Sequence, residues 1–119
     1  MNIRRYRKAL ERTYTDRVTA QRNGKYTDPV THETRLGLYQ VYADKPCRIS
    51  QKSLGSNGQT ETVNNIAYEI KLFAAPELDI KQGDKLTVTR GRVTRIFTAG
   101  EPFPYPTHQE ISLGREAKA

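Results

Sequence analysis

The sequence predicts a mainly β protein, a small antiparallel β-barrel or sandwich with a short N-terminal helix and one long polar loop. Two observations favour this fold class. Leu86 and Val88 alternate with polar residues, which is the pattern of a strand with one buried face. Tight-turn signals at residues 82–84 and 90–91 bound that strand, because glycine supplies the positive backbone angles that tight turns need. With 119 residues, the chain is expected to form one domain.

The N-terminal segment, residues 1–13, is predicted to be a basic helix or arm. Ile3, Tyr6 and Leu10 follow the i, i+3, i+7 spacing, which places them on one helix face. A helix of about twelve residues is marginal on its own. We therefore expect the apolar stripe to dock on the β body or on a neighbouring chain.

The β body is expected over residues 14–113. It begins with a strand at 16–21 and a hairpin turn at Asn23-Gly24, since Asn-Gly is a strong two-residue hairpin signal. Strands at 35–42 and 46–50 follow. Six of their apolar side chains are candidates for the core: Leu36, Leu38, Tyr39, Val41, Tyr42 and Ile49.

The C-terminal half supplies the clearest strand, at residues 66–73, and a closing strand at 110–113. Three prolines interrupt the chain between residues 102 and 106, and proline cannot donate to a sheet ladder. The tail, residues 114–119, is expected to be frayed. Four side chains are predicted to lie in the core: Leu72, Leu86, Val88 and Ile111.

A long polar interval at residues 51–65 is predicted to be a flexible loop, because it has few apolar residues and no periodicity. Loops of this length in a small domain are functional or disordered. The candidate functional positions are Gln51, Lys52, Ser53, Leu54, Gly55, Ser56, Asn57, Gly58, Gln59 and Thr60.

The net charge of +7 is unevenly distributed. Residues 1–26 carry eight basic and two acidic side chains, a net charge of +6. A basic segment on a nearly neutral body indicates contact with an acidic partner, and the alternative is a solvated helix face. The candidate docking residues are Ile3, Arg4, Arg5, Tyr6, Arg7, Lys8, Leu10 and Arg12.

The sequence offers no catalytic motif, so we expect a protein that is not an enzyme. A single cysteine, Cys47, and two distant histidines, His32 and His108, do not match zinc-ligand spacing. A lone cysteine in a strand is most often a small core residue. We therefore expect no metal and no cofactor. No apolar run approaches the ~18 residues of a membrane span, so no membrane association is expected.

The order of segments from residue 47 onward resembles the head-closure proteins of tailed bacteriophages, also called stopper, head-completion or minor capsid proteins. The resemblance covers a little over half of the chain. It runs through CRISQ (47–51), YEIKLF (68–73), IKQGDKLTV (80–88), RG (90–91), FTAGEP (97–102) and HQEISL (108–113). The basic helix has no counterpart in the shortest members of that family, so the resemblance assigns it no role.

The resemblance implies a small β-barrel that assembles as a homo-oligomeric ring, expected to be dodecameric, beneath the portal and its adaptor. Such a ring retains packaged viral DNA through transient contact and offers the tail-attachment surface to a tail-terminator protein. The loop before the strand at 67–73 acts as a channel gate, which corresponds here to residues 51–65. Assembly in the bacterial host cytoplasm and a place in the virion, at the head–tail interface, follow from the same resemblance.

A second interpretation is a small basic nucleic-acid-binding module of SH3-like or OB-like type. A pI near 9.7 and seven tyrosines support it. Binders of that type place aromatic side chains on an exposed strand face among basic residues. Tyr39, Tyr42 and Tyr68 instead occupy positions typical of the core or its rim.

Overall fold

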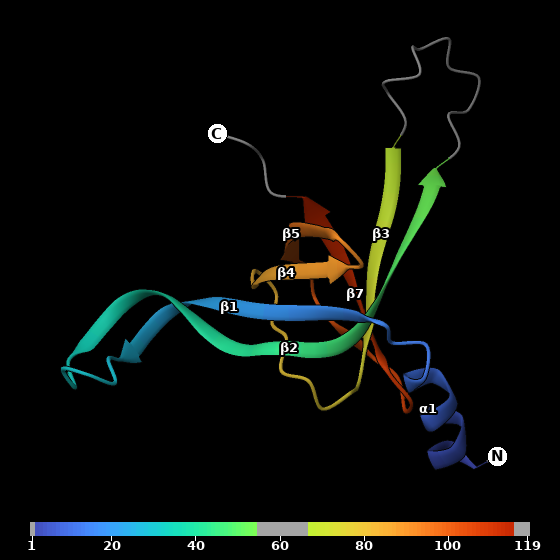
Figure 1. Cartoon of the computed structure of the whole chain (residues 1–119), viewed down its shortest axis with the longest axis horizontal. Coiled ribbons are helices and arrows are strands. Elements are labelled where there is room, and N and C mark those ends of the chain that lie inside the picture. Colours follow the sequence, from blue (N-terminus) through green and yellow to red (C-terminus); the bar gives the residue numbers. More distant parts are fainter. Residues whose placement is uncertain (1, 55–66, 116–119) are drawn as a thin grey trace, which may run out of the picture.

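The computed structural model describes residues 2–54 and 67–115, which form one helix and seven strands (Figure 1). The predicted class, mainly β and antiparallel with a short N-terminal helix, is confirmed. The elements are α1 (Ile3–Glu11), β1 (Asp16–Thr27), β2 (Thr34–Leu54), β3 (Ala67–Ala74), β4 (Lys85–Arg90), β5 (Val93–Ala99), β6 (Phe103–Pro104) and β7 (Gln109–Arg115).

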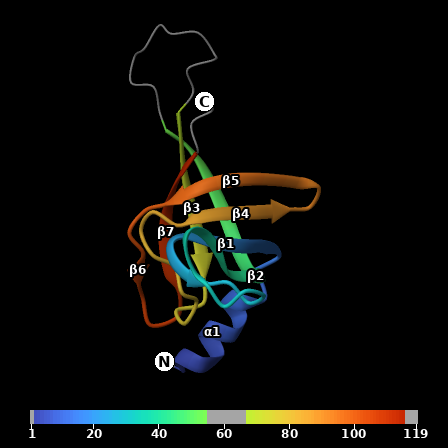
Figure 2. The ribbon, with the colours of Figure 1, turned by 90° about the vertical axis from the view of Figure 1, so that its left-hand side faces the viewer.

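Six of the strands close a ring. The pairing order is β3-β2-β1-β4-β5-β7, and β7 pairs back with β3. In Figure 2, β5, β4 and β1 follow one another down the ring and α1 lies below them. The short strand β6 pairs with Gln109 and Glu110 of β7 on the edge opposite to β3, next to the stretch at residues 113–115 that pairs with β5.

The predicted core residues lie inside this ring. Leu72, Leu86 and Ile111 are fully buried and Val88 is 3% exposed. Phe97 is the largest side chain that is completely buried. The period-two alternation therefore identified the inner face of the ring correctly.

The predicted hairpin turn at Asn23-Gly24 is wrong. Both residues are paired inside β1, with Gly24 opposite Gly37. The turn lies at residues 28–33, where an Asp28 carboxylate oxygen accepts hydrogen bonds from the backbone of Val30 and Thr31. This Asx-type turn competes with the local Asn-Gly preference, and it lengthens both strands.

The strands predicted at 35–42 and 46–50 are one continuous strand, β2. Register shifts opposite Val18–Gln21 and a positive φ of 52° at Asp44 mark an irregularity that the strand absorbs without ending. The tail prediction is wrong at residues 114–115, which belong to β7. Residues 116–119 lie outside the described part.

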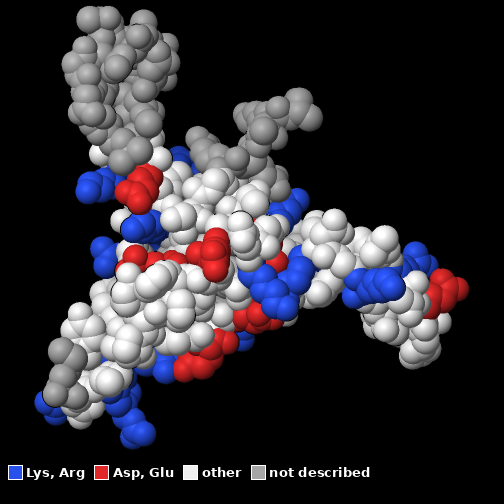
Figure 3. Space-filling view, turned by 180° about the vertical axis from the view of Figure 1, so that it is seen from behind, with Lys and Arg blue, Asp and Glu red and all other residues white. Residues whose placement is uncertain are grey.

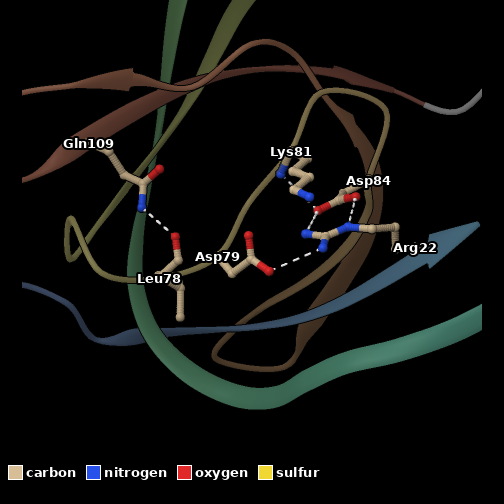
Figure 4. Close-up of polar contacts among 6 residues, drawn as sticks. All are labelled: Arg22, Leu78, Asp79, Lys81, Asp84 and Gln109. Carbon is tan, nitrogen blue, oxygen red and sulfur yellow. Dashed lines mark hydrogen bonds and ion pairs between the residues drawn. The ribbon is translucent and has the colours of Figure 1, made fainter.

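A buried ion pair fastens the connection between β3 and β4 to the ring (Figure 4). The carboxylate of Asp84, 2% exposed, accepts two hydrogen bonds of 2.9 Å from the Arg22 guanidinium and one from the Lys81 backbone. The third nitrogen of the same guanidinium contacts Asp79 at 3.1 Å. At the other end of the connection, the Gln109 amide donates to the backbone carbonyls of Ala75 and Leu78.

Candidate functional site

The outer part of the β1–β2 hairpin projects from the ring, and we call residues 22–39 the arm (Figure 1). Within the described residues, β4 pairs with β1 only at Arg17–Gln21 and β3 pairs with β2 only from Arg48 onward. The arm is therefore a two-stranded ribbon whose outer edges are both open.

One face of the arm carries exposed leucines. Leu36 is 79% and Leu38 is 46% exposed, so their predicted place in the core is wrong. The reason is that the arm extends beyond the ring that would cover them. Lys25 is paired directly opposite Leu36, which puts it on the same face. Sequence reasoning missed this surface because the alternation in residues 34–42 indicates a strand with one apolar face but does not show whether another part of the protein covers that face.

A groove lies between α1, the middle of β2 and the β3–β4 connection. Its volume is about 690 Å³. Its apolar wall includes Pro46, Ala75 and Leu78, with the rings of Tyr14 and Tyr42. The hydroxyls of both tyrosines are buried without a hydrogen-bond partner among the described residues. Burial raises the pKa of each phenol above its ordinary value.

The rim of this groove is charged. Glu11, Glu77 and Asp79 supply three carboxylates, and Arg7 and Lys45 supply two cations. Figure 3 shows acidic side chains gathered between α1 and the arm, and both basic and acidic side chains on the arm itself.

Arg7 belongs to this rim rather than to a free basic face. Its guanidinium donates to Glu11 at 2.8 Å and also to Glu77. These hydrogen bonds, with the one to Glu77 as the larger cause, raise the pKa of Arg7, and the same bond lowers the pKa of Glu77. Arg7 thus holds α1 to the β3–β4 connection, and it differs from the docking residues with which the sequence grouped it.

The other basic residues of α1 share one exposed face. A shallow surface hollow is lined by Arg4, Arg5, Lys8 and Arg12, together with Asn2. None of these four cationic side chains forms an ion pair with a described residue. The Asn2 side chain caps the helix by accepting a hydrogen bond from the Arg5 backbone at 3.2 Å.

The apolar stripe of α1 docks on the body only in part. Leu10 lies beside Tyr14, Phe73 and His108. Ile3 and Tyr6 are 50% and 49% exposed, so of the two predicted docking surfaces the subunit's own body covers only part of the stripe. Packing against another chain stays a prediction.

The predicted gating loop divides into two parts. Residues 51–54 belong to β2 and pair with β3, Gln51 opposite Ile70 and Leu54 opposite Ala67, so the loop prediction is wrong at its first four positions. The remaining positions, 55–65, lie outside the described residues. Within residues 51–54, the side chains of Gln51, Lys52 and Ser53 are exposed.

The chemically reactive groups are held in structural contacts. Cys47 is fully buried, and desolvation raises its pKa to about 12. The His108 ring lies 3.0 Å from a Glu110 carboxylate oxygen and stacks on Tyr105. Across residues 2–54 and 67–115, no three histidine, cysteine or acidic side chains come together as a metal site would require.

The helix in the described part of the chain lacks the length and apolar character needed to cross a bilayer. No protein-family model, curated protein or solved structure matches this chain.

Proposed function

We propose that this chain is a structural subunit of the head-to-tail connector of a tailed bacteriophage, a head-closure protein that acts as a ring rather than as an enzyme. The observation that carries the proposal is the arm. An ordered ribbon that leaves the body with Leu36 and Leu38 exposed is typical of a subunit that buries those residues on assembly.

The segments that resemble the head-closure family lie on five of the six strands that close the ring, and β1 is the exception. Residues 47–51 lie on β2, 68–73 on β3, 80–88 lead into β4, and 108–113 lead into β7. In the proposed connector this ring of strands is the rigid body of each subunit. The arm and α1 are then the parts available for contacts with neighbouring proteins.

We place α1 against the portal or adaptor. Ile3 and Tyr6 offer apolar surface, and Arg4, Arg5 and Lys8 offer cations for an acidic partner. Charge alone does not choose between protein and DNA, because carboxylate and phosphate both accept the arginine fork. The half-exposed apolar residues favour protein, since the DNA backbone offers little apolar surface.

Residues 51–65, which comprise the end of β2 and the segment that follows it, are the proposed DNA gate in the lumen of the oligomeric ring. They carry one cation, Lys52, and one acidic residue, Glu61, so they have little net charge with which to bind phosphates. A gate that releases DNA on ejection is expected to bind it weakly, because each neutralised phosphate adds salt-dependent affinity.

One observation favours the alternative, a nucleic-acid-binding module. Phe103 and Tyr105 are 61% and 40% exposed, and their rings lie 5.0 Å apart. Exposed aromatic rings of this kind can stack on bases. The cation Lys71, however, is shared between Glu69 and Glu110, so this side chain already has carboxylate partners and is not free for a phosphate.

Two measurements on the full-length chain separate these functions. Light scattering after size exclusion, with electron microscopy of the peak, reports whether closed rings form. Titration of a labelled DNA duplex and of a labelled single strand at about 50 and 200 mM salt reports affinity. The connector subunit is expected to form rings and bind DNA weakly. A monomer whose log affinity falls with log salt at a slope of about −3 to −4, as four phosphate contacts would give, would establish the alternative instead.

A further inference from the structure

We infer that the arm of one subunit lies in the groove of a neighbouring copy. This contact would join the subunits of the homo-oligomeric ring. This inference rests on the proposed function, because it specifies how the proposed ring is joined.

The arm requires a partner on physical grounds. A two-stranded ribbon is marginally stable in water, and stability generally needs a third strand, a helix or an apolar surface against one face. Here both edges are open and Leu36 is 79% exposed. Open edges beside apolar side chains favour association with another chain.

The arm does not reach the groove of its own subunit. It points away from the ring, whereas α1 lies at the opposite side of the molecule (Figure 1). Tyr26 and Tyr39, whose rings lie 5.7 Å apart, form a half-buried pair on the face opposite to the leucines. The leucine face therefore remains free for a second chain.

The groove has the chemistry to accept this face. Leu36 and Leu38 match its apolar wall, which includes Pro46 and Leu78. Lys25, beside Leu36 on the arm, has no ion-pair partner in the described residues. The rim carboxylates of Glu77 and Asp79 are paired inside the subunit with Arg7 and Arg22, but their side chains are 64% and 56% exposed, so each can accept a further cation such as Lys25. Apolar contact at the centre with opposite charges around it is the usual arrangement of a specific interface.

The symmetry of this contact agrees with a ring. Arm and groove are different surfaces of one subunit, so their contact is heterologous, and heterologous contacts generate rings when the rotation closes. Arm-to-arm pairing is the main competing arrangement. It would be isologous and would stop at a dimer.

The first test measures self-association of the full-length protein by sedimentation equilibrium. Leu36→Glu and Leu38→Glu are each expected to raise the dissociation constant by about 10-fold to 100-fold, because burial of one leucine is lost and a charge enters the contact. Both positions are exposed, so circular dichroism should show unchanged folding. The control is Val93→Glu, an apolar residue 51% exposed on β5, which should leave association unchanged.

The second test identifies the surface that the arm meets. Cysteine is introduced at Leu36 on the arm and at Lys45 on the groove rim, in one chain, and treated with a short bismaleimide. A ladder of covalent oligomers is expected, while each single variant alone should give none. Cys47 is buried and does not compete. Dimers from Leu36→Cys alone would show arm-to-arm pairing and overturn the inference.

These outcomes separate the inference from the proposed function. If the wild-type protein forms rings that neither leucine variant weakens and no ladder appears, the arm-in-groove contact is wrong and the connector role stands. If the wild-type protein remains a monomer at every concentration, the proposed ring and this contact both fail.

Discussion

The ion pair between Arg22 and Asp84 offers the sharpest test of how the body is held together. Arg22→Met keeps the aliphatic stem and removes the guanidinium. Asp84 would then lose two of its three hydrogen bonds and keep the one from the Lys81 backbone. Because the carboxylate is 2% exposed, water can replace the lost donors only in part.

The expected loss of stability follows from this burial. Removing one partner of a buried ion pair costs about 3–5 kcal/mol. The Arg22 side chain is 16% exposed, so some water reaches the site, and we expect the lower end, about 3 kcal/mol. For a chain of this length that corresponds to a fall in melting temperature of roughly 10–15 °C.

Urea unfolding followed by circular dichroism measures this change. Arg95→Met is the matched control, since Arg95 is exposed on β5 and has no acidic partner among the described residues; it should change stability by less than about 0.5 kcal/mol. The double variant with Asp84→Asn should lose less than the sum of the two single losses, by about 1–3 kcal/mol. An Arg22→Met protein within 1 kcal/mol of wild type would refute the assigned role.

Three further outcomes are expected. Val88→Asp should abolish cooperative folding, because it places a carboxylate at a position 3% exposed in the core; a soluble variant with a sharp melting transition would contradict the ring register. Tyr42→Phe removes a buried hydroxyl that has no partner in the described structure, so urea unfolding should show equal or greater stability, by up to about 1 kcal/mol. The Cys47 pKa of about 12 lies above its ordinary value of 9.0, so between those values only the unfolded chain releases the proton. Stability should therefore fall as pH rises from 9 toward 12, by up to about 1.4 kcal/mol per pH unit from this thiol, and the fall should be smaller in Cys47→Ala.

The sequence predicts the strands and the fold class, a barrel or a sandwich, because the strands obey a local rule. Leu86 and Val88 alternate with polar neighbours, and such a strand needs a covered face whatever its partner is. The turns at Gly83 and Gly91 are equally local, since both glycines adopt positive φ values, 92° and 60°. These features need no knowledge of distant residues.

The arm could not be predicted in the same way. Asn23-Gly24 favours a tight turn locally, yet the strands continue because the pairing of β1 with β2 carries on to Thr27 and Thr34. Whether Leu36 is buried depends on where the ring ends, which is a property of the whole sheet. A signal in favour of a longer hairpin was present at Asp28-Pro29, a pair that promotes turns.

The polar contacts of the site depend on tertiary structure to an even greater degree. Arg22 and Asp84 are 62 residues apart in the chain, and Arg7 meets Glu77 over 70 residues. The sequence shows that the N-terminal segment has a positive net charge, but it does not show which of its cations form ion pairs within the subunit. Only the fold separates Arg7, which holds α1 to the body, from Arg4 and Arg5, which face outward.

This division of the N-terminal charge bears on how copies would meet. Two of the arginines in residues 1–26, Arg7 and Arg22, are used inside the subunit. The exposed cations that remain in this segment are Arg4, Arg5, Lys8 and Arg12 at α1 and its C-cap, Arg17 on β1 and Lys25 on the arm, and carboxylates of the groove rim lie between α1 and the arm (Figure 3). Two copies side by side in the same orientation would bring their basic α1 ends together, and these ends would repel. The outer arm, residues 23–39, has no net charge, because Lys25 and Arg35 balance Asp28 and Glu33. A head-to-tail approach keeps the α1 ends apart and brings the exposed leucines of one arm to the groove of the next copy, so both effects favour the same arrangement.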